Sequence, residues 1–180
     1  MKFEINYKIL TATLIFIILI LSLFTFLKYQ KIEGKIYKSE ELSLRYPKEW
    51  QEIPLENLQK IDPELKVGFE DTKGEGKFLL RIKEGVSKIQ SFEEIEKELD
   101  KTMAKNLNSF KKISSEKIKM GGRESLDYNY TYKSKEEEIR QKMILVFGEE
   151  KIYYLIFHAP EEKFEVYKED FNLIISSLRI

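Results

Sequence analysis

The chain has 180 residues, which is enough for one ordinary domain and little more. It contains no cysteine, so disulfide frameworks, thiol nucleophiles and thiolate metal sites are excluded. Residues 39–180 carry 29 acidic and 25 basic side chains, a net negative charge that is unfavourable for binding the phosphates of nucleic acids.

The first predicted element in the chain is a transmembrane helix over residues 9–27. These 19 residues carry no charge and are rich in isoleucine, leucine and phenylalanine. A helix of that length is about 28 Å long, close to the ~30 Å thickness of the hydrocarbon core of a bilayer. Residue types that favour the membrane interface flank it at Tyr7, Lys8, Lys28 and Tyr29. We therefore expect a single-pass anchor in the lipid bilayer, preceded by a short tail of residues 1–8.

A cleaved signal peptide is the alternative interpretation of this segment. Its apolar core would usually be shorter, and the bulky residues 23–26 offer no cleavage site with small side chains. Two signals oppose each other on orientation. The four lysines within residues 28–38 outnumber the two in the tail, which favours a cytoplasmic domain under the positive-inside rule. A short tail, one span and a following domain are instead the usual layout of a signal anchor, and we expect the domain outside the cytoplasm.

The folded domain is expected to span residues 39–180, after a polar linker at 28–38. Its first half predicts short strands, because apolar and polar residues alternate between turn-forming segments. The predicted strands are residues 42–46, a short strand after Trp50, 67–69 and 78–82. Residues 51–66 contain two prolines and are expected to form a loop with one helical turn.

The second half predicts a helix, a three-stranded meander and a closing helix. Ser91 and Glu94 have the spacing of a capping box, and the apolar residues that follow at helical spacing are Phe92, Ile95, Leu99, Met103 and Leu107. The meander strands are residues 126–132, 139–147 and 152–157. The last of these is apolar on both faces, and Pro160 marks the start of the closing helix. These elements predict an α+β fold, in which helices flank both faces of an antiparallel sheet (an α-β-α sandwich), preceded by one transmembrane helix.

Two short motifs resemble those of the PsbP-like domain family. Residues 42–47 read LSLRYP and are followed by Trp50, and residues 159–164 read APEEKF before a helix that ends in IISSL at 174–178. The resemblance covers residues 39–180 in element order as well as in motif. It implies an antiparallel sheet flanked by helices, in a family used mainly for binding and assembly. Plant members bind the surface of a photosystem subunit, and that partner cannot be carried over to this chain.

Few residues point to chemistry. His158 is the only histidine, so one chain cannot form a two-histidine metal site or a relay between imidazoles. Acidic residues cluster at 93–100 and 136–138, where interleaved lysines and a turn favour solvated surface, and a weak divalent-cation site is the alternative. Trp50 and His158 are weak binding candidates, with the core and a strand end as their ordinary roles. No catalytic, cofactor-binding or metal-binding residue is predicted.

The sequence therefore predicts a membrane-tethered, non-catalytic binding or assembly module in the cell membrane, with its domain outside the cytoplasm. The expected partner is a membrane or surface protein that the sequence does not specify, and no cofactor or nucleic acid is expected. The alternative is an enzyme with a carboxylate-based, hydrolase-like site that has no recognisable motif. Two carboxylates of raised pKa converging in a deep pocket would favour this alternative.

Overall fold

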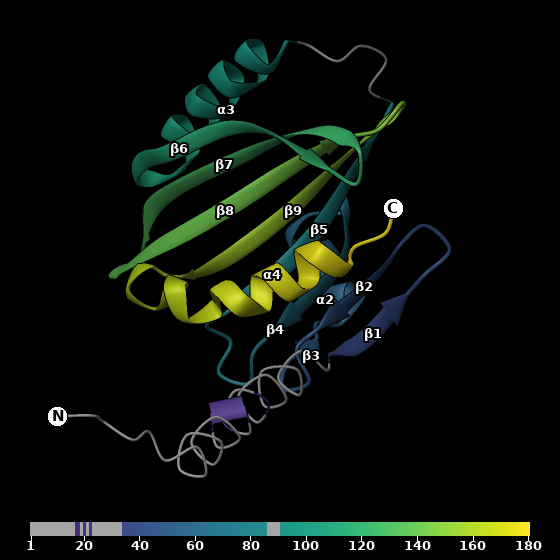
Figure 1. Ribbon diagram of the computed structural model, residues 1–180. Helices are drawn as coiled ribbons and strands as arrows, with labels where there is room; N and C mark the ends of the chain where they lie inside the picture. The colour runs from purple at the N-terminus through teal and green to yellow at the C-terminus, as the bar shows by residue number, and fades with distance from the viewer. Residues whose placement is uncertain (1–16, 19, 21, 23–33, 86–90) are drawn as a thin grey trace, which may run out of the picture.

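A seven-stranded antiparallel sheet is the largest element of the computed structural model (Figure 1), which describes residues 17, 18, 20, 22, 34–85 and 91–180. The strands of this sheet are β3 (Gln51–Glu52), β4 (Leu65–Glu70), β5 (Lys77–Glu84), β6 (Asn108–Met120), β7 (Arg123–Ser134), β8 (Glu137–Phe147) and β9 (Lys151–Pro160). Their order across the sheet is β3-β4-β5-β9-β8-β7-β6. The last four strands in the sequence therefore form a meander, and its final strand β9 joins it to β5.

The central strands carry apolar residues on both faces and give the sheet two hydrophobic clusters. Successive side chains of a strand point to opposite faces. In β9, Leu155 and Phe157 accordingly join one cluster, while Tyr154 and Ile156 join the other. β9 is paired along its length with β5 on one side and with β8 on the other. This is the position that the doubly apolar run 152–157 predicts.

A hairpin and the closing helix cover the first face of the sheet. The hairpin consists of β1 (Lys35–Lys38) and β2 (Ser43–Tyr46), and the chain ends in the 3-10 helix η1 (Glu161–Tyr167) followed by α4 (Lys168–Ser177). Phe171 of α4 packs on Phe157 of β9, with 4.8 Å between ring centroids. Trp50 stands edge-on to Phe171 and is only 2% exposed. Trp50 is therefore enclosed by the core of this face.

Two helices pack against the second face and leave a strip of it uncovered. Helix α2 (Leu55–Ile61) buries Leu58 next to Gly68 of β4. Helix α3 (Phe92–Asn106) lies over the β6–β7 side of the sheet (Figure 1). The predicted capping box is present: the Ser91 hydroxyl accepts a hydrogen bond from the Glu94 backbone N–H at 3.2 Å, and the Glu94 carboxylate accepts one from the Ser91 N–H at 3.0 Å. Helices on both faces agree with the predicted α-β-α arrangement.

The folded part begins earlier than the predicted linker allows. Residues 35–38 form β1, which pairs antiparallel with β2. Gly34 comes directly before β1, and a Cβ atom there would lie 2.5 Å from the carbonyl oxygen of Tyr46, so glycine is needed for this close approach. Tyr37 of β1 stands edge-on to Phe69 in the core at 5.7 Å. The predicted boundary at residue 39 therefore cuts through the hairpin.

The structure contains β6, a 13-residue strand that the sequence pattern does not predict. The strand is rich in lysine and serine, and its pairing with β7 shifts register twice, which breaks the alternation of apolar and polar residues. β6 is an edge strand, where lysines discourage pairing with further chains. The predicted three-stranded meander therefore has four strands. The closing helix also differs, since it begins as a 3-10 helix and becomes α-helical only at Lys168.

The predicted anchor at residues 9–27 lies outside the described residues except at positions 17, 18, 20 and 22, and the tail 1–8 lies outside them entirely. Within the part of the chain that the structure describes, no helix has the length and apolar character needed to cross a membrane. The anchor stays a prediction from the sequence.

Candidate functional site

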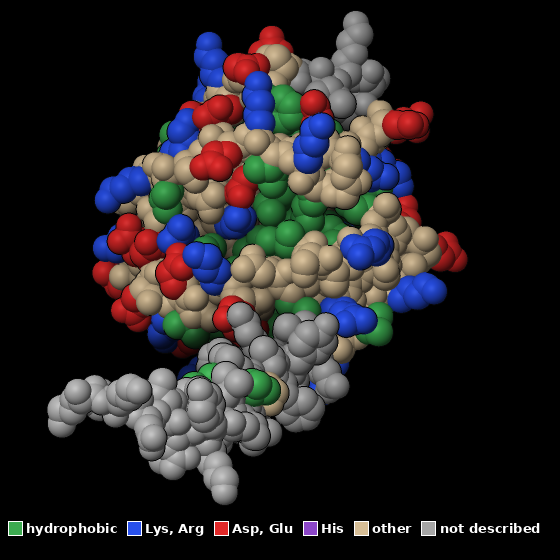
Figure 2. Space-filling view, in the orientation of Figure 1, with side chains coloured by type: hydrophobic (Ala, Val, Ile, Leu, Met, Phe, Trp, Pro, Cys, Tyr) green, Lys and Arg blue, Asp and Glu red, His purple; other side chains and the backbone are tan. Residues whose placement is uncertain are grey.

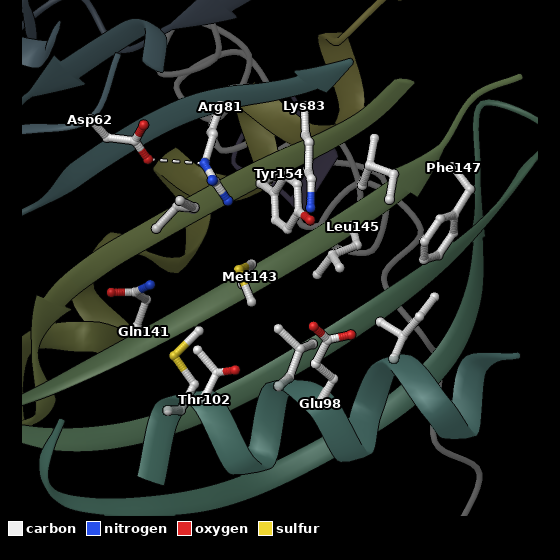
Figure 3. Close-up of a pocket in the computed structure, with 15 residues that line it drawn as sticks. Asp62, Arg81, Lys83, Glu98, Thr102, Gln141, Met143, Leu145, Phe147 and Tyr154 are labelled. Carbon is white, nitrogen blue, oxygen red and sulfur yellow. Dashed lines mark ion pairs between the residues drawn. The ribbon is translucent and has the colours of Figure 1, made fainter. Parts of the chain in front are cut away.

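An open groove of about 540 Å³ lies between α3 and the sheet (Figure 3). This volume is within the range of about 300–1,000 Å³ that is typical of ligand pockets. The floor of this α3 groove is made by β8 and β9 and includes Met143, Leu145, Tyr154 and Ile156. Figure 2 shows the opposite side of the sheet, on which α4 lies and where hydrophobic side chains gather in a central hollow, so the α3 groove is on the far side of that view. Charged residues also line the α3 groove, namely Asp62, Arg81, Lys83 and Glu98. The groove is therefore an apolar surface within a polar rim.

The groove exists because α3 does not fully cover the sheet beneath it. The apolar stripe of α3, which includes Ile95, Leu99 and Met103, packs against the second cluster, but no residue of α3 is fully buried. On the floor, Tyr154 and Ile156 are only half-buried. A sheet face with apolar side chains is stabilised when it is covered. Half-buried apolar residues on both the helix and the strand mark this strip as a surface available for binding.

One wall of the groove is basic. Arg81 of β5 forms ion pairs with Asp62 and Glu64, and its guanidinium lies 5.0 Å from the centroid of the Tyr154 ring. Two carboxylates therefore balance the charge of Arg81. Lys83 lies two residues further along β5 and points into the groove beside Tyr154 (Figure 3). Among the described residues, Lys83 has no ion pair.

The opposite wall is the exposed edge of α3, where Glu98 and Thr102 point toward the groove (Figure 3). Other acidic residues of α3 are paired with β6: Lys112 contacts Asp100 at 2.7 Å and Glu96 at 3.0 Å. Glu98 is different, because it has no ion pair within the described part of the chain. Among the described residues that line it, the α3 groove thus carries one positive charge without an ion pair, Lys83, and one negative charge without an ion pair, Glu98.

The tyrosine row of β7 lies beside the groove and stabilises the second cluster. The Tyr128 hydroxyl donates a hydrogen bond to Asp100 at 2.6 Å, and burial together with this bond raises the pKa of Tyr128 far above the ordinary value of 10.0. Burial likewise raises the pKa of Tyr130. Phenols with raised pKa values stay protonated at neutral pH and are poor nucleophiles or bases. Tyr128 and Tyr130 therefore act as packing groups in the second cluster, and Asp100 satisfies the hydroxyl of Tyr128.

The two weak binding candidates do not come together. Trp50 belongs to the cluster on the first face, whereas His158 of β9 lies next to Tyr132 on the second face. The Nδ1 atom of His158 is 3.3 Å from the Tyr132 hydroxyl. Burial, with a smaller contribution from the charge of Lys77, lowers the pKa of His158 to about 4. His158 is therefore neutral at physiological pH, and neither residue lines the α3 groove.

The acidic segment 136–138 lies at the turn between β7 and β8. It borders a shallow hollow together with Glu161 and Glu162 at the start of η1. Within residues 17, 18, 20, 22, 34–85 and 91–180, no three acidic or histidine side chains are grouped so that they could hold a metal ion. The acidic residues 93–100 are largely engaged with lysines of β6.

Sequence reasoning did not identify the residues of the groove as a site. The stripe of α3 was visible at helical spacing, and the strands of the floor were visible as apolar runs. The missing information is that α3 sits toward one side of the sheet and leaves β9 open. A sequence signal that could have drawn attention to the helix is the presence of Glu98 and Thr102 beside its apolar stripe.

Comparison with known proteins agrees with the fold. The PsbP-like protein family matches residues 26–180 of the sequence. The structure is similar to cyanobacterial PsbP from Synechocystis sp. PCC 6803, with a TM-score of 0.64 and 14% identity over 81% of this chain and 91% of that chain. It is also similar to LpqN, which is involved in cell envelope biogenesis of Mycobacterium tuberculosis, with a TM-score of 0.54 and 14% identity over 81% and 83% of the two chains.

A protein of unknown function from Pseudomonas aeruginosa has the same fold at a TM-score of 0.52 and 10% identity, over 78% of this chain and 92% of that chain. No curated protein matches the sequence. Because the sequence identities to these solved structures are low, the structures establish the fold alone. The family match extends over most of the chain and confirms the resemblance seen in the motifs at 42–47 and 159–164. The chain belongs to the PsbP-like protein family.

Proposed function

We propose that this protein is a membrane-tethered, non-catalytic binding module whose domain lies outside the cytoplasm and binds its partner in the α3 groove. The observation that carries the proposal is the groove itself, an open apolar strip of about 540 Å³ within an otherwise well-packed domain. Concave apolar surfaces with a few polar groups at the rim are the usual form of binding sites. Contiguous apolar surface of this kind is uncommon on soluble domains unless it is used.

The residues of the groove support binding rather than turnover. Its carboxylates do not converge, because Asp62 is held by Arg81 at 2.9 Å on one side and Glu98 projects from the other side. A carboxylate-based hydrolytic site needs two such groups close to the reacting bond. His158 lies outside the groove and is neutral, hydrogen-bonded to Tyr132. The similar proteins named above fit a non-catalytic module.

The tether and the orientation rest on the uncharged segment 9–27 and its flanking tyrosines and lysines. Anchoring a binding domain raises its effective concentration near other membrane components, so even a modest interface can be occupied. The proposed partner is accordingly a membrane or cell-surface protein.

Filling the groove should strongly weaken partner binding without unfolding the domain. Thr102 is exposed on α3 and points into the groove, so a bulky Thr102→Trp side chain would occupy the space over the floor. Lys101→Trp adds the same side chain at the neighbouring exposed position, which does not line the groove. We expect partner recovery to fall by about tenfold for Thr102→Trp and to stay unchanged for Lys101→Trp, because only the former introduces a steric clash.

The measurement uses the tagged full chain, taken from membranes in detergent-free polymer-bounded lipid discs, with quantitative mass spectrometry of the proteins recovered. Discs avoid detergent, which would itself occupy an apolar groove. Equal thermal unfolding of the two variants is the control for folding. Recovery of the same proteins at the same level with Thr102→Trp would exclude the groove as the binding site.

Labelling of single introduced cysteines should reveal the orientation. Because the chain has no cysteine, Lys101→Cys and Asn6→Cys each provide a unique thiol, one on the exposed side of α3 and one in the tail. A membrane-impermeant maleimide added to intact cells is expected to label Lys101→Cys and to label Asn6→Cys only after permeabilisation. Both chains should stay in the membrane fraction after alkaline carbonate extraction. The reverse labelling pattern would place the domain in the cytoplasm. Release of the chain from the membrane by carbonate would contradict the predicted transmembrane anchor.

A further inference from the structure

We infer that the occupant of the α3 groove is an amphipathic α-helix of a partner protein, with an acidic side chain facing Lys83 and a basic side chain facing Glu98. This inference rests on the proposed function, since it names the partner of the same groove. Three features of the groove support it: the pairing of its floor, the arrangement of the helices on this face, and the charges of its two walls.

The floor of the groove offers no backbone partners to an incoming chain. β9 is hydrogen-bonded to β5 on one side and to β8 on the other, and β8 is in turn bonded to β7. An extended peptide lying on these strands would leave its N–H and C=O groups facing apolar side chains, which is unfavourable when such groups are shielded from water. An α-helix satisfies its own backbone groups internally and presents only side chains. The floor therefore favours a helical occupant.

The helices already present on this face leave room for another. α2 packs on β4 through Leu58, and its C-terminal neighbour Asp62 borders the groove from that side. α3 borders the groove from the other side through Leu99 and Met103. The floor between them is made by Met143, Tyr154 and other apolar residues of β8 and β9. A helix laid between α2 and α3 would complete the helical layer on this face and cover the half-buried apolar residues.

The charges of the walls indicate what flanks the apolar stripe of that helix. Lys83 and Glu98 stand on opposite walls, and neither has an ion pair among the described residues. Arg81, the other cation of the groove, is balanced by Asp62 and Glu64. A lipid with a single anionic headgroup would match only the Lys83 wall. A helix with an acidic and a basic residue on its two flanks matches both walls, as complementary charge at an interface requires.

Photo-methionine cross-linking tests the inference with the full chain in the cells that produce it. The chain has four methionines, of which Met103 and Met143 line the groove while Met120 lies in the cluster of the other face. Photo-methionine is close to methionine in size, so it reports on the groove without blocking it. The matched control is the Met103→Leu/Met143→Leu variant, which keeps photo-methionine outside the groove. Mass spectrometry identifies the cross-linked segment.

We expect an adduct from Met103 or Met143 to a protein segment with apolar residues three and four apart, an acidic residue on one flank and a basic residue on the other. The adduct should be absent from the double leucine variant. Lys83→Glu and Glu98→Lys should each lower its yield by roughly fivefold, the effect expected for losing one partly exposed charge pair, while Lys83→Arg should retain it.

An adduct to a lipid, to a second copy of this chain or to a segment without the helical pattern would overturn the helical partner and leave the groove as the binding site. Unchanged yield with Lys83→Glu and Glu98→Lys would also overturn the assignment. Absence of any adduct at Met103 and Met143 would overturn both the helical partner and the proposed function. Thermal unfolding of each variant, compared with that of the parent chain, separates loss of binding from loss of folding.

Discussion

Replacing Trp50 with alanine is expected to lower the free energy of unfolding by about 3–5 kcal/mol, the usual effect of truncating a large aromatic side chain in a packed core. Trp50 is 2% exposed and stands edge-on to the rings of Tyr167 and Phe171, each with 6.1 Å between ring centroids. Alanine would leave a cavity between the sheet and α4 that the surrounding residues can fill only partly. Urea unfolding followed by far-ultraviolet circular dichroism measures the change, because the variant loses the only tryptophan.

The same variant decides between two roles for Trp50. If Trp50 is a core residue on the face opposite the α3 groove, replacing it with alanine should not affect partner binding by the molecules that remain folded at low temperature. Trp50→Phe, which keeps an aromatic ring, should lose less stability than Trp50→Ala. A Trp50→Ala protein with unchanged stability and lost association would instead make Trp50 a recognition residue, the role considered from sequence.

Acidification is expected to destabilise the protein through His158. Its pKa in the folded protein is about 4, against 6.5 for the ordinary side chain, because the ring is buried and lies near Lys77. As the pH falls through 6.5 the unfolded chain takes up a proton at this histidine, while the folded protein does so only near pH 4. The contribution of His158 to stability is therefore constant above pH 6.5, falls between 6.5 and 4, and is constant below. The full loss is about 3 kcal/mol.

A comparison with His158→Gln isolates this contribution from the carboxylates that titrate in the same range. Glutamine keeps a polar side chain near the Tyr132 hydroxyl but does not titrate. The free energy of unfolding of both proteins should be measured in urea at about pH 7.5 and about pH 4. The parent should lose about 3 kcal/mol more than the variant on acidification. An equal loss in the two proteins would show that His158 takes up its proton at the same pH in the folded and unfolded states.

Several parts of the fold could be predicted from the sequence because their causes are local. The capping box of Ser91 and Glu94 and the apolar residues that follow it at helical spacing define α3 from within one segment. The alternation over 126–132 defines β7, and the apolar run 152–157 indicates a strand covered on both sides. The motifs at 42–47 and 159–164 pointed to the PsbP-like family, which the match over residues 26–180 confirms.

Two strands whose formation depends on backbone pairing with the next strand, more than on their own side-chain pattern, were missed. β1 is a four-residue strand without an apolar pattern, and it forms because β2 pairs with it and Tyr37 reaches Phe69 in the core. β6 is a strand by virtue of its pairing with β7, despite a sequence rich in lysine and serine and two shifts of register. Pairing of backbone groups supplies the hydrogen bonds of such edge strands, and these bonds do not depend on the identity of the side chains.

By itself, the sequence determined the α+β class, the positions of most strands and helices, and the expectation of an N-terminal anchor, because each depends on the periodicity or composition of one segment. The tertiary structure alone decided where the candidate site lies. Leu99, Met143 and Tyr154 are far apart in the chain and meet in one groove only because α3 packs toward the β6 side of the sheet and leaves β9 uncovered. It also decided that Trp50 and His158 lie on opposite faces. Which apolar residues are covered, and which are left open to a partner, depends on how separate elements pack against one another, and no single segment contains that information.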